Sequence, residues 1–328
     1  MSTQQPPTKK IKKIKIFSSE SLVNAIPVEI WRDVICTKLG YFDRSNVNAT
    51  CNEFNDTFLD YKQKFLKKHA IHVPQDVRTI EKAMELVAKT VDPTEKDPLR
   101  IVLDKGVHEI SESDYPGNDS DSDDEFVADY YKKLHITRSH ITFVGKGKDQ
   151  TTILGGVDVR NQQNVNFEEL AITNPKGDRF GLYFGGTTAN VLKCAVKECG
   201  WTGMSVSSGS TVTATQCEFM DNCANGVSCH GKNTKAILND CQMHHNGTGL
   251  LAFFHPVVDI HGTKTDIAKN IKGIYADRRG KVNIHLPSQH NTIHDNVERD
   301  RVQGNPVYAG PNGSIANIND DGTFTHVE

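Results

Sequence analysis

The chain has 328 residues, of which 37% are hydrophobic and 24% charged, a balance that supports a folded core and excludes a fully disordered chain. The formal net charge of −3 provides no basic field, so we expect no nucleic-acid partner. No apolar run approaches the ~18 residues of a membrane span, and the lysine-rich N-terminus is unlike a secretory signal. We therefore expect a cytoplasmic or nuclear protein that has no membrane partner.

Residues 1–22 have the composition of a tail. Pro6 and Pro7 are followed by five lysines between positions 9 and 15. Two interpretations remain open for this basic segment: a nuclear-import signal, or a disordered arm that keeps the chain in solution.

Residues 23–69 have the pattern of short amphipathic helices. Apolar side chains recur at spacings of three and four from Ile30 to Leu39, while Pro27 suits a first helical position and Gly40 suits a helix end. A module of this size is too small to bury all of its apolar surface. The apolar stripe therefore packs on the rest of the chain or docks on a partner.

The segment Ala25–Leu39 resembles the opening of an F-box, and Asp43–Asn55 resembles its second half. The resemblance departs from the family at Arg44–Asn46, which is more polar, and at Tyr61 and Phe65, which stand where a tryptophan is usual. It implies that the module docks on a Skp-type adaptor and, through it, on a cullin–RING ubiquitin ligase. The residues that it assigns to adaptor binding are Ile26, Pro27, Ile30, Trp31, Val34 and Leu39.

The remainder of the chain, residues 71–328, repeats itself. Glycine precedes an apolar segment at positions 181, 203, 226, 249 and 273, at spacings of 22, 23, 23 and 24 residues. A second series with the same period consists of Cys194, Cys217 and Cys241, each followed five residues later by Cys199, Asn222 and Asn246, and then by Asn270 and Asn296. Two series with one period of about 23 residues predict a solenoid.

Short alternating segments such as Ser210–Cys217 and Lys281–Leu286 predict coils of three strands rather than leucine-rich repeats. Stacking of such coils by parallel pairing would place equivalent residues in columns. We expect the asparagines to form a ladder at a turn and the cysteines to form an inward apolar ladder. The eight cysteines include no CxxC pair, so we expect free thiols and no metal site.

This part of the chain resembles the right-handed parallel β-helix superfamily that includes the pectate lyases. Residues 75–90 are similar to the amphipathic helix that caps the first coil, and Leu99–Ile110 and Leu134–Gly147 are similar to the first coils. Residues 111–129 interrupt the array with an acidic run that lacks the glycine and glutamate of a calcium loop. The predicted fold class is mainly β, a right-handed parallel β-helix preceded by a small all-α module.

We next consider whether the array carries out chemistry. The carboxylate and histidine motifs of polygalacturonases are missing or in the wrong order around Cys229–Gly231 and Asp320–Asp321. Asp259 and the run Asp277–Arg279 could be assigned to calcium and base roles of a lyase, but ordinary turn polarity is the simpler interpretation. The histidines of the later coils form no compact metal signature. We therefore expect no catalytic residue, no cofactor and no metal.

The sequence hypothesis is a non-enzymatic substrate receptor of a cullin–RING ligase, in which the β-helix binds an unknown protein substrate. The alternative is a carbohydrate-active β-helix enzyme, a polysaccharide lyase or hydrolase. A third possibility is a scaffold that binds the adaptor without delivering a substrate.

Overall fold

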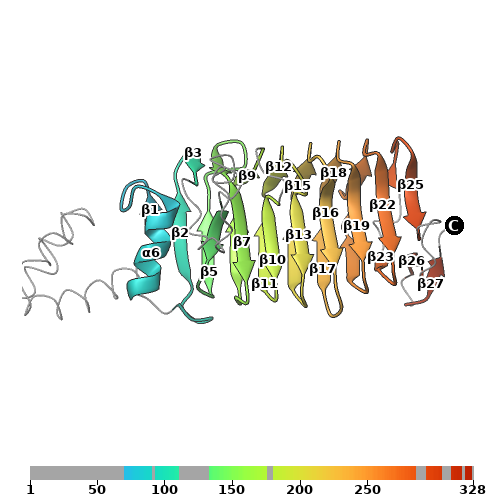
Figure 1. Ribbon diagram of the computed structural model, residues 1–328, viewed down its shortest axis with the longest axis horizontal. Coiled ribbons are helices and arrows are strands. Elements are labelled where there is room, and N and C mark those ends of the chain that lie inside the picture. Colours follow the sequence, from blue (N-terminus) through green and yellow to red (C-terminus); the bar gives the residue numbers. More distant parts are fainter. Residues whose placement is uncertain are drawn as a thin grey trace, which may run out of the picture. The chain divides into compact units, whose positions relative to one another are not determined.

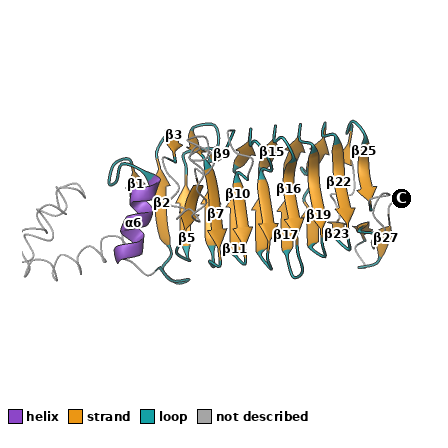
Figure 2. Ribbon diagram, viewed as in Figure 1, coloured by secondary structure: helices purple, strands orange, loops and turns teal. Residues whose placement is uncertain are grey.

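The computed structural model describes seven stretches of the chain, and in these it is built almost entirely of β-strands (Figure 2). The described stretches are residues 70–90, 93–110, 133–175, 180–285, 293–304, 312–319 and 322–326. The predicted tail, the predicted all-α module at residues 23–69 and the acidic insertion lie outside them. The fold class of the described residues is therefore mainly β.

The strands form three sheets that run the length of a solenoid (Figure 1). Sheet 1 contains β1 (Ile71–Val73), β2 (Leu99–Leu103), β5 (Ile141–Val144), β8 (Val165–Glu168), β11 (Thr188–Leu192), β14 (Thr211–Thr215), β17 (Lys235–Asn239), β20 (Val257–His261), β23 (Lys281–His285), β26 (Ser314–Ile318) and β27 (Phe324–His326). Sheet 2 contains β3 (Gly106–Glu109), β6 (Thr151–Leu154), β9 (Ala171–Thr173), β12 (Ala195–Lys197), β15 (Glu218–Met220), β18 (Gln242–His244), β21 (Asp266–Ala268) and β24 (Ile293–His294). Sheet 3 contains β4 (Lys133–Ile136), β7 (Gly156–Arg160), β10 (Leu182–Gly185), β13 (Met204–Ser207), β16 (Asn225–His230), β19 (Thr248–Phe253), β22 (Lys272–Asp277) and β25 (Arg299–Gln303).

Each coil contributes one strand to every sheet, and each strand pairs in parallel with its equivalents in the coils before and after it. The pairing register confirms the glycine period: the residues that follow the repeated glycines, Leu182, Met204, Val227, Leu250 and Ile274, are partners in sheet 3. One pair departs from the pattern, since β27 runs antiparallel to β26.

The core lies inside the coils, where alternate residues of all three sheets point. Stacking places like on like in sheet 1, where the rings of Phe143 and Phe167 lie 5.2 Å apart and nearly parallel. Phe184 of sheet 3 meets Phe167 edge to face across the core at 6.2 Å. All three rings are fully buried. Cys194, Cys217 and Cys241 are also buried and free, as the inward ladder predicts. Burial raises the pKa of the Cys194 thiol. All three side chains are fully buried, so the ladder contributes to the packing of the core.

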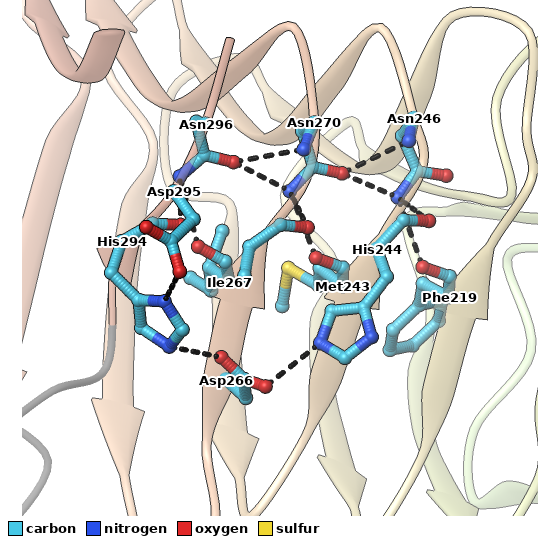
Figure 3. Close-up of polar contacts among 11 residues, drawn as sticks. Phe219, Met243, His244, Asn246, Asp266, Ile267, Asn270, His294, Asp295 and Asn296 are labelled. Carbon is cyan, nitrogen blue, oxygen red and sulfur yellow. Dashed lines mark hydrogen bonds and ion pairs between the residues drawn. The ribbon is translucent and has the colours of Figure 1, made fainter.

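The predicted asparagine ladder is present at the turn between sheet 2 and sheet 3 (Figure 3). The side-chain amide of Asn222 donates to Asn246 at 3.0 Å, that of Asn246 donates to Asn270 at 2.9 Å, and that of Asn270 donates to Asn296 at 3.0 Å. Each acceptor oxygen also takes the backbone N–H of the preceding asparagine. Asp300 ends the column by accepting from Asn296 at 2.7 Å. The ladder thereby satisfies backbone groups at a corner where no strand pairing can.

One helix, α6 (Ile80–Thr90), lies beside the first strands (Figure 1). It buries Ile80, Ala83, Met84 and Val87 on one face, as expected for a cap on the first coil. The helix begins five residues later than the predicted range 75–90. The side chain of Thr79 caps it by accepting the N–H of Lys82, and a turn closed by His72 and Asp76 precedes it.

Candidate functional site

The outer face of sheet 3 carries a cluster of ionisable side chains at its first coils. Asp158 occupies an outward position of β7, between the buried Val157 and Val159, and pairs in register with His135 on β4. Its carboxylate accepts the Nε–H of Arg160, with the nitrogen 2.8 Å from one oxygen and 3.1 Å from the other. The Nδ1 of His135 lies 3.8 Å from the second oxygen. We call His135, Asp158 and Arg160 the Asp158 cluster.

Burial differs sharply within the Asp158 cluster. The side chain of Asp158 is 4% exposed, whereas those of His135 and Arg160 are 37% and 60% exposed. A buried carboxylate beneath a guanidinium holds that cation in a fixed direction. The cluster therefore presents an oriented cation and an imidazole to a ligand on the surface.

Tyr183 supports the cluster from the next strand, β10. The guanidinium of Arg160 lies 4.8 Å from the centre of its ring, a cation–π contact. Its hydroxyl accepts a hydrogen bond from Ser207 on β13 at 2.8 Å. Beyond it the outward residues are small, namely Ser205, Ser207 and Ser228, all of them buried.

A second group of side chains on sheet 3 lies at the turns that lead into sheet 1. Phe253 ends β19, and Phe254 and His255 follow it; Arg278 and Arg279 follow β22 one coil later. The guanidinium of Arg278 lies 4.8 and 4.6 Å from the ring centres of Phe253 and Phe254. We call these five residues the turn patch.

Sheet 1 carries a polar cluster around Asp259 on β20. Its carboxylate receives Lys235 at 2.9 Å and Asn283 at 2.8 Å, and the Nε2 of His285 lies 3.3 Å away. Burial alone would raise the pKa of Asp259, but these three hydrogen bonds lower it overall. His261 stacks on His285 with ring centres 4.1 Å apart, and burial, together with that neighbour, lowers the pKa of His261. The carboxylate of Asp259 is therefore already bonded by three side chains of the protein, those of Lys235, Asn283 and His285.

Sheet 2 carries a third cluster, in the last coils (Figure 3). Asp266 lies between two histidines of the neighbouring strands: the Nε2 of His244 is 3.0 Å from one carboxylate oxygen, and the Nε2 of His294 is 3.1 Å from the other. His294 also contacts Asp295 at 2.9 Å. The hydrogen bond to Asp295 and the charge of Asp266 outweigh partial burial and raise the pKa of His294.

The structure separates the residues that the sequence suggested for a calcium-dependent lyase. Asp259 lies on sheet 1, whereas Asp277, Arg278 and Arg279 lie at the end of a strand of sheet 3. Asp277 is buried, and its carboxylate accepts the N–H of Arg278 and the hydroxyl of Tyr275. These residues therefore do not fit a shared calcium site. Within the described stretches, no group of three or more His, Cys, Asp or Glu side chains is arranged to hold a metal ion.

The Asp158 cluster was not expected from the sequence, although a signal was present. Gly156 lies one coil before the first glycine of the repeat series, and the strand that begins there places Asp158 between two valines and Arg160 directly after the second. Extending the series back by one coil would have aligned Asp158 with Tyr183 in the outward column. The six residues assigned to adaptor binding, Ile26, Pro27, Ile30, Trp31, Val34 and Leu39, lie outside the described stretches.

Comparison with protein families gives a match to the right handed beta helix region, over residues 102–243 and 181–321. The matched residues together span well over half of the chain. The match begins beyond residues 23–69, so it does not support their resemblance to an F-box, and the Skp-type adaptor and cullin partners stay a prediction. No curated protein matches the chain in sequence. None of the described helices is long and apolar enough to cross a membrane.

Among solved structures, the chain is similar to ORF18 of Geobacillus virus E2, with 11% identity and a TM-score of 0.46 over 83% of this chain and 65% of that one. It is also similar to the pectin methylesterase PemA from Erwinia chrysanthemi (12% identity, TM-score 0.44, 79% and 85% covered). A third similar structure is the pectate lyase Pel9A, with 13% identity and a TM-score of 0.42 over 66% of this chain and 67% of that one. The chain thus spans less than two thirds of the viral protein.

These likenesses concern the fold, but they correct one prediction. We expected a non-enzymatic adaptor because the carboxylate motifs of sugar hydrolases are missing from the sequence. Solved structures that resemble the chain include a methylesterase and a lyase, which are enzymes. The lack of one family's motifs was therefore no ground for excluding enzymatic activity, because one fold supports several kinds of catalytic site.

Proposed function

Because the chain belongs to the right-handed β-helix family, we propose that it is a carbohydrate-active member with the Asp158 cluster as its site, and that its reaction is the elimination catalysed by a polysaccharide lyase. The substrate class is an acidic polysaccharide, in which sugar rings carry carboxylates. The observation that carries the proposal is the exposed guanidinium of Arg160, oriented by the buried carboxylate of Asp158 beside the exposed imidazole of His135.

The recognition step follows from the chemistry of the cation. A guanidinium binds a carboxylate in a directed, charge-assisted geometry, and less entropy is lost when the cation is already held in place. Asp158 and the ring of Tyr183 hold Arg160 in this way. A sugar carboxylate bound to Arg160 would lie on the same face as His135, because both side chains approach Asp158.

The elimination step requires a base and a positive charge. In this proposal His135 takes the proton from the carbon next to the sugar carboxylate. The electron pair of that C–H bond forms a carbon–carbon double bond, the bond to the leaving sugar oxygen breaks, and the oxygen takes a proton from solvent. Negative charge grows on the carboxylate during proton removal, and Arg160 stabilises it. Asp158 acts as a positioning residue for both partners.

Glycoside hydrolysis is the less suitable reaction for this face. It uses two carboxylates within about 9.5 Å of each other. In the two outward columns that contain Asp158 and Arg160, the described carboxylates are Asp158 on β7 and Asp277 on β22. Five strand steps separate these strands, or roughly 24 Å at the usual spacing.

The proposal is tested by incubating the purified chain with polygalacturonate and with alginate and recording the ultraviolet absorbance of the unsaturated product. We expect His135→Ala to lower kcat about 10²- to 10⁴-fold, because it removes the base. Asp158→Asn should lower kcat/KM less, since Arg160 loses its orientation but keeps its charge. His245→Ala, an exposed histidine at another corner, is the matched control. Absence of unsaturated product from both polymers, or a His135→Ala variant as fast as the wild type, would show the proposal to be wrong.

A further inference from the structure

The turn patch differs from the equivalent turns of earlier coils. Between sheet 3 and sheet 1, the turns of those coils also contain residues in the left-handed region, but these are short or lack a side chain: Asn161, Gly186, Ser208, Gly209 and Gly231. In the turn patch the residues with positive φ carry large side chains, namely Phe254 (63°), His255 (71°), Arg278 (45°) and Arg279 (65°). The turn patch therefore presents aromatic and basic side chains where earlier coils present small ones.

The patch combines positive charge with an exposed aromatic surface. Phe254 is 43% exposed, and its ring meets that of Phe253 at 4.4 Å while both contact Arg278. Arg279 is exposed, with its Nη1 3.5 Å from the Nε2 of His255. The acid beside the patch, Asp277, is buried and accepts the backbone N–H of Arg278 and the hydroxyl of Tyr275. The patch therefore carries two guanidinium groups, those of Arg278 and Arg279, beside its aromatic rings.

The patch and the Asp158 cluster share a column of sheet 3. Register pairing connects Arg160 to Phe253 through three intervening residues, Gly185, Ser207 and His230. Four strand steps separate β7 from β19, roughly 19 Å along the solenoid axis. Two of the three residues between the two sites, Gly185 and Ser207, have a small side chain or none.

We propose that the turn patch is a second subsite for the acidic sugar chain, which lies along sheet 3 and reaches both the Asp158 cluster and the patch. This inference rests on the proposed function. Arg278 and Arg279 would bind carboxylates of sugar units remote from the reacting one, and the exposed ring of Phe254 would pack on the apolar face of a sugar ring. A chain that contacts both subsites binds more tightly than a fragment that reaches one, because the second contact is intramolecular.

The experiment is calorimetric binding of digalacturonate and of a long oligogalacturonate to His135→Ala protein, whose slowed turnover preserves the ligand while Asp158 still orients Arg160. In that background we compare Arg278→Gln/Arg279→Gln, the single variant Arg279→Gln, and Lys269→Gln, an exposed charge at another corner, as the matched control. We expect the double variant to weaken binding of the long oligomer about tenfold or more, and to weaken binding of digalacturonate less. Arg279→Gln should also weaken binding of the long oligomer more than binding of digalacturonate, and Lys269→Gln should change the affinity for neither ligand.

The outcomes separate the two proposals. Equal affinity of the long oligomer for the double variant and the control would overturn the second subsite, while product formation by the wild type would leave the proposed function standing. An equal loss for both ligands would also overturn the subsite. Failure of the wild-type chain both to bind and to convert either sugar would overturn both proposals. Thermal unfolding of each variant shows whether a loss of binding reflects a loss of folding.

Discussion

At the scale of single residues, the turn patch combines a local conformational cost with an exposed surface. Arg279 has φ near 65°, a value that glycine tolerates and other residues resist. Its side chain is exposed, and its Nη1 lies 3.5 Å from the Nε2 of His255, a long contact. Little in the folded state therefore compensates for the backbone energy at this position.

This backbone energy cost can be measured by replacing Arg279 with each of two small residues in turn. Arg279→Gly and Arg279→Ala remove the same contacts, but alanine keeps the unfavourable left-handed conformation. We expect the glycine variant to have the higher free energy of unfolding, by about 1 kcal/mol, in urea titrations. An alanine variant as stable as the glycine variant would contradict the conformational cost inferred at this turn.

At the scale of elements, β24 illustrates how a short edge strand is attached. It has two residues and is the terminal strand of sheet 2. Its pairing with β21 is supplemented by the contact between His294 and Asp266 (Figure 3). His294 also bonds Asp295, so its protonated form is the better bound one in the folded state.

The raised pKa of His294 has a definite pH dependence. Its contribution to stability is fully present below the ordinary value of 6.5 and is lost as pH rises through the folded value. We expect His294→Gln to be less stable than the wild type at acidic pH, and the difference to vanish above the folded pKa. Because the site is exposed, the difference should stay under about 1 kcal/mol. Urea unfolding across this pH range measures it, with His245→Gln as control; a gap that widens with pH would contradict the assignment.

At the scale of the whole molecule, the asparagine ladder connects successive coils along one corner. In a solenoid each coil contacts only its neighbours, so stability depends on the interfaces between them. Asn246 bonds the coil on each side, through Asn222 and Asn270, and also donates to the carbonyl of Phe219. Removing its side chain would leave buried partners of both neighbours unsatisfied.

Asn246→Ala should therefore lower the free energy of unfolding by about 1–3 kcal/mol, because buried donors and acceptors lose their partners. Asn239→Ala is the matched control, since that amide lies on the outer face and makes one long bond to Thr215. We expect it to change stability by less than about 1 kcal/mol in the same urea titration. Equal losses for the two variants would mean that the ladder contributes no more than a surface contact.

The spacing of residues along the chain was sufficient to predict the solenoid, its period and its two ladders. The reason is that a coil is a local unit: stacking coils of nearly equal length brings residues about 23 positions apart together, so spacing alone predicts which residues meet. The same reasoning aligned the repeated glycines with the strands of sheet 3. It would also have found Asp158 and Tyr183, had the series been extended by one coil.

Which polar side chains share a face, in contrast, became clear from the folded chain alone. Asp259 and Asp277 are 18 positions apart in the sequence, yet they lie on different sheets because the chain turns two corners between them, with β21 of sheet 2 in the middle. Whether an outward carboxylate is covered by an arginine or solvated depends on side-chain directions across several coils, which periodicity does not specify. The physical distinction is between backbone pairing, which repeats, and surface contacts, which do not. The fold could therefore be derived from the pattern of the chain, whereas the candidate site could not.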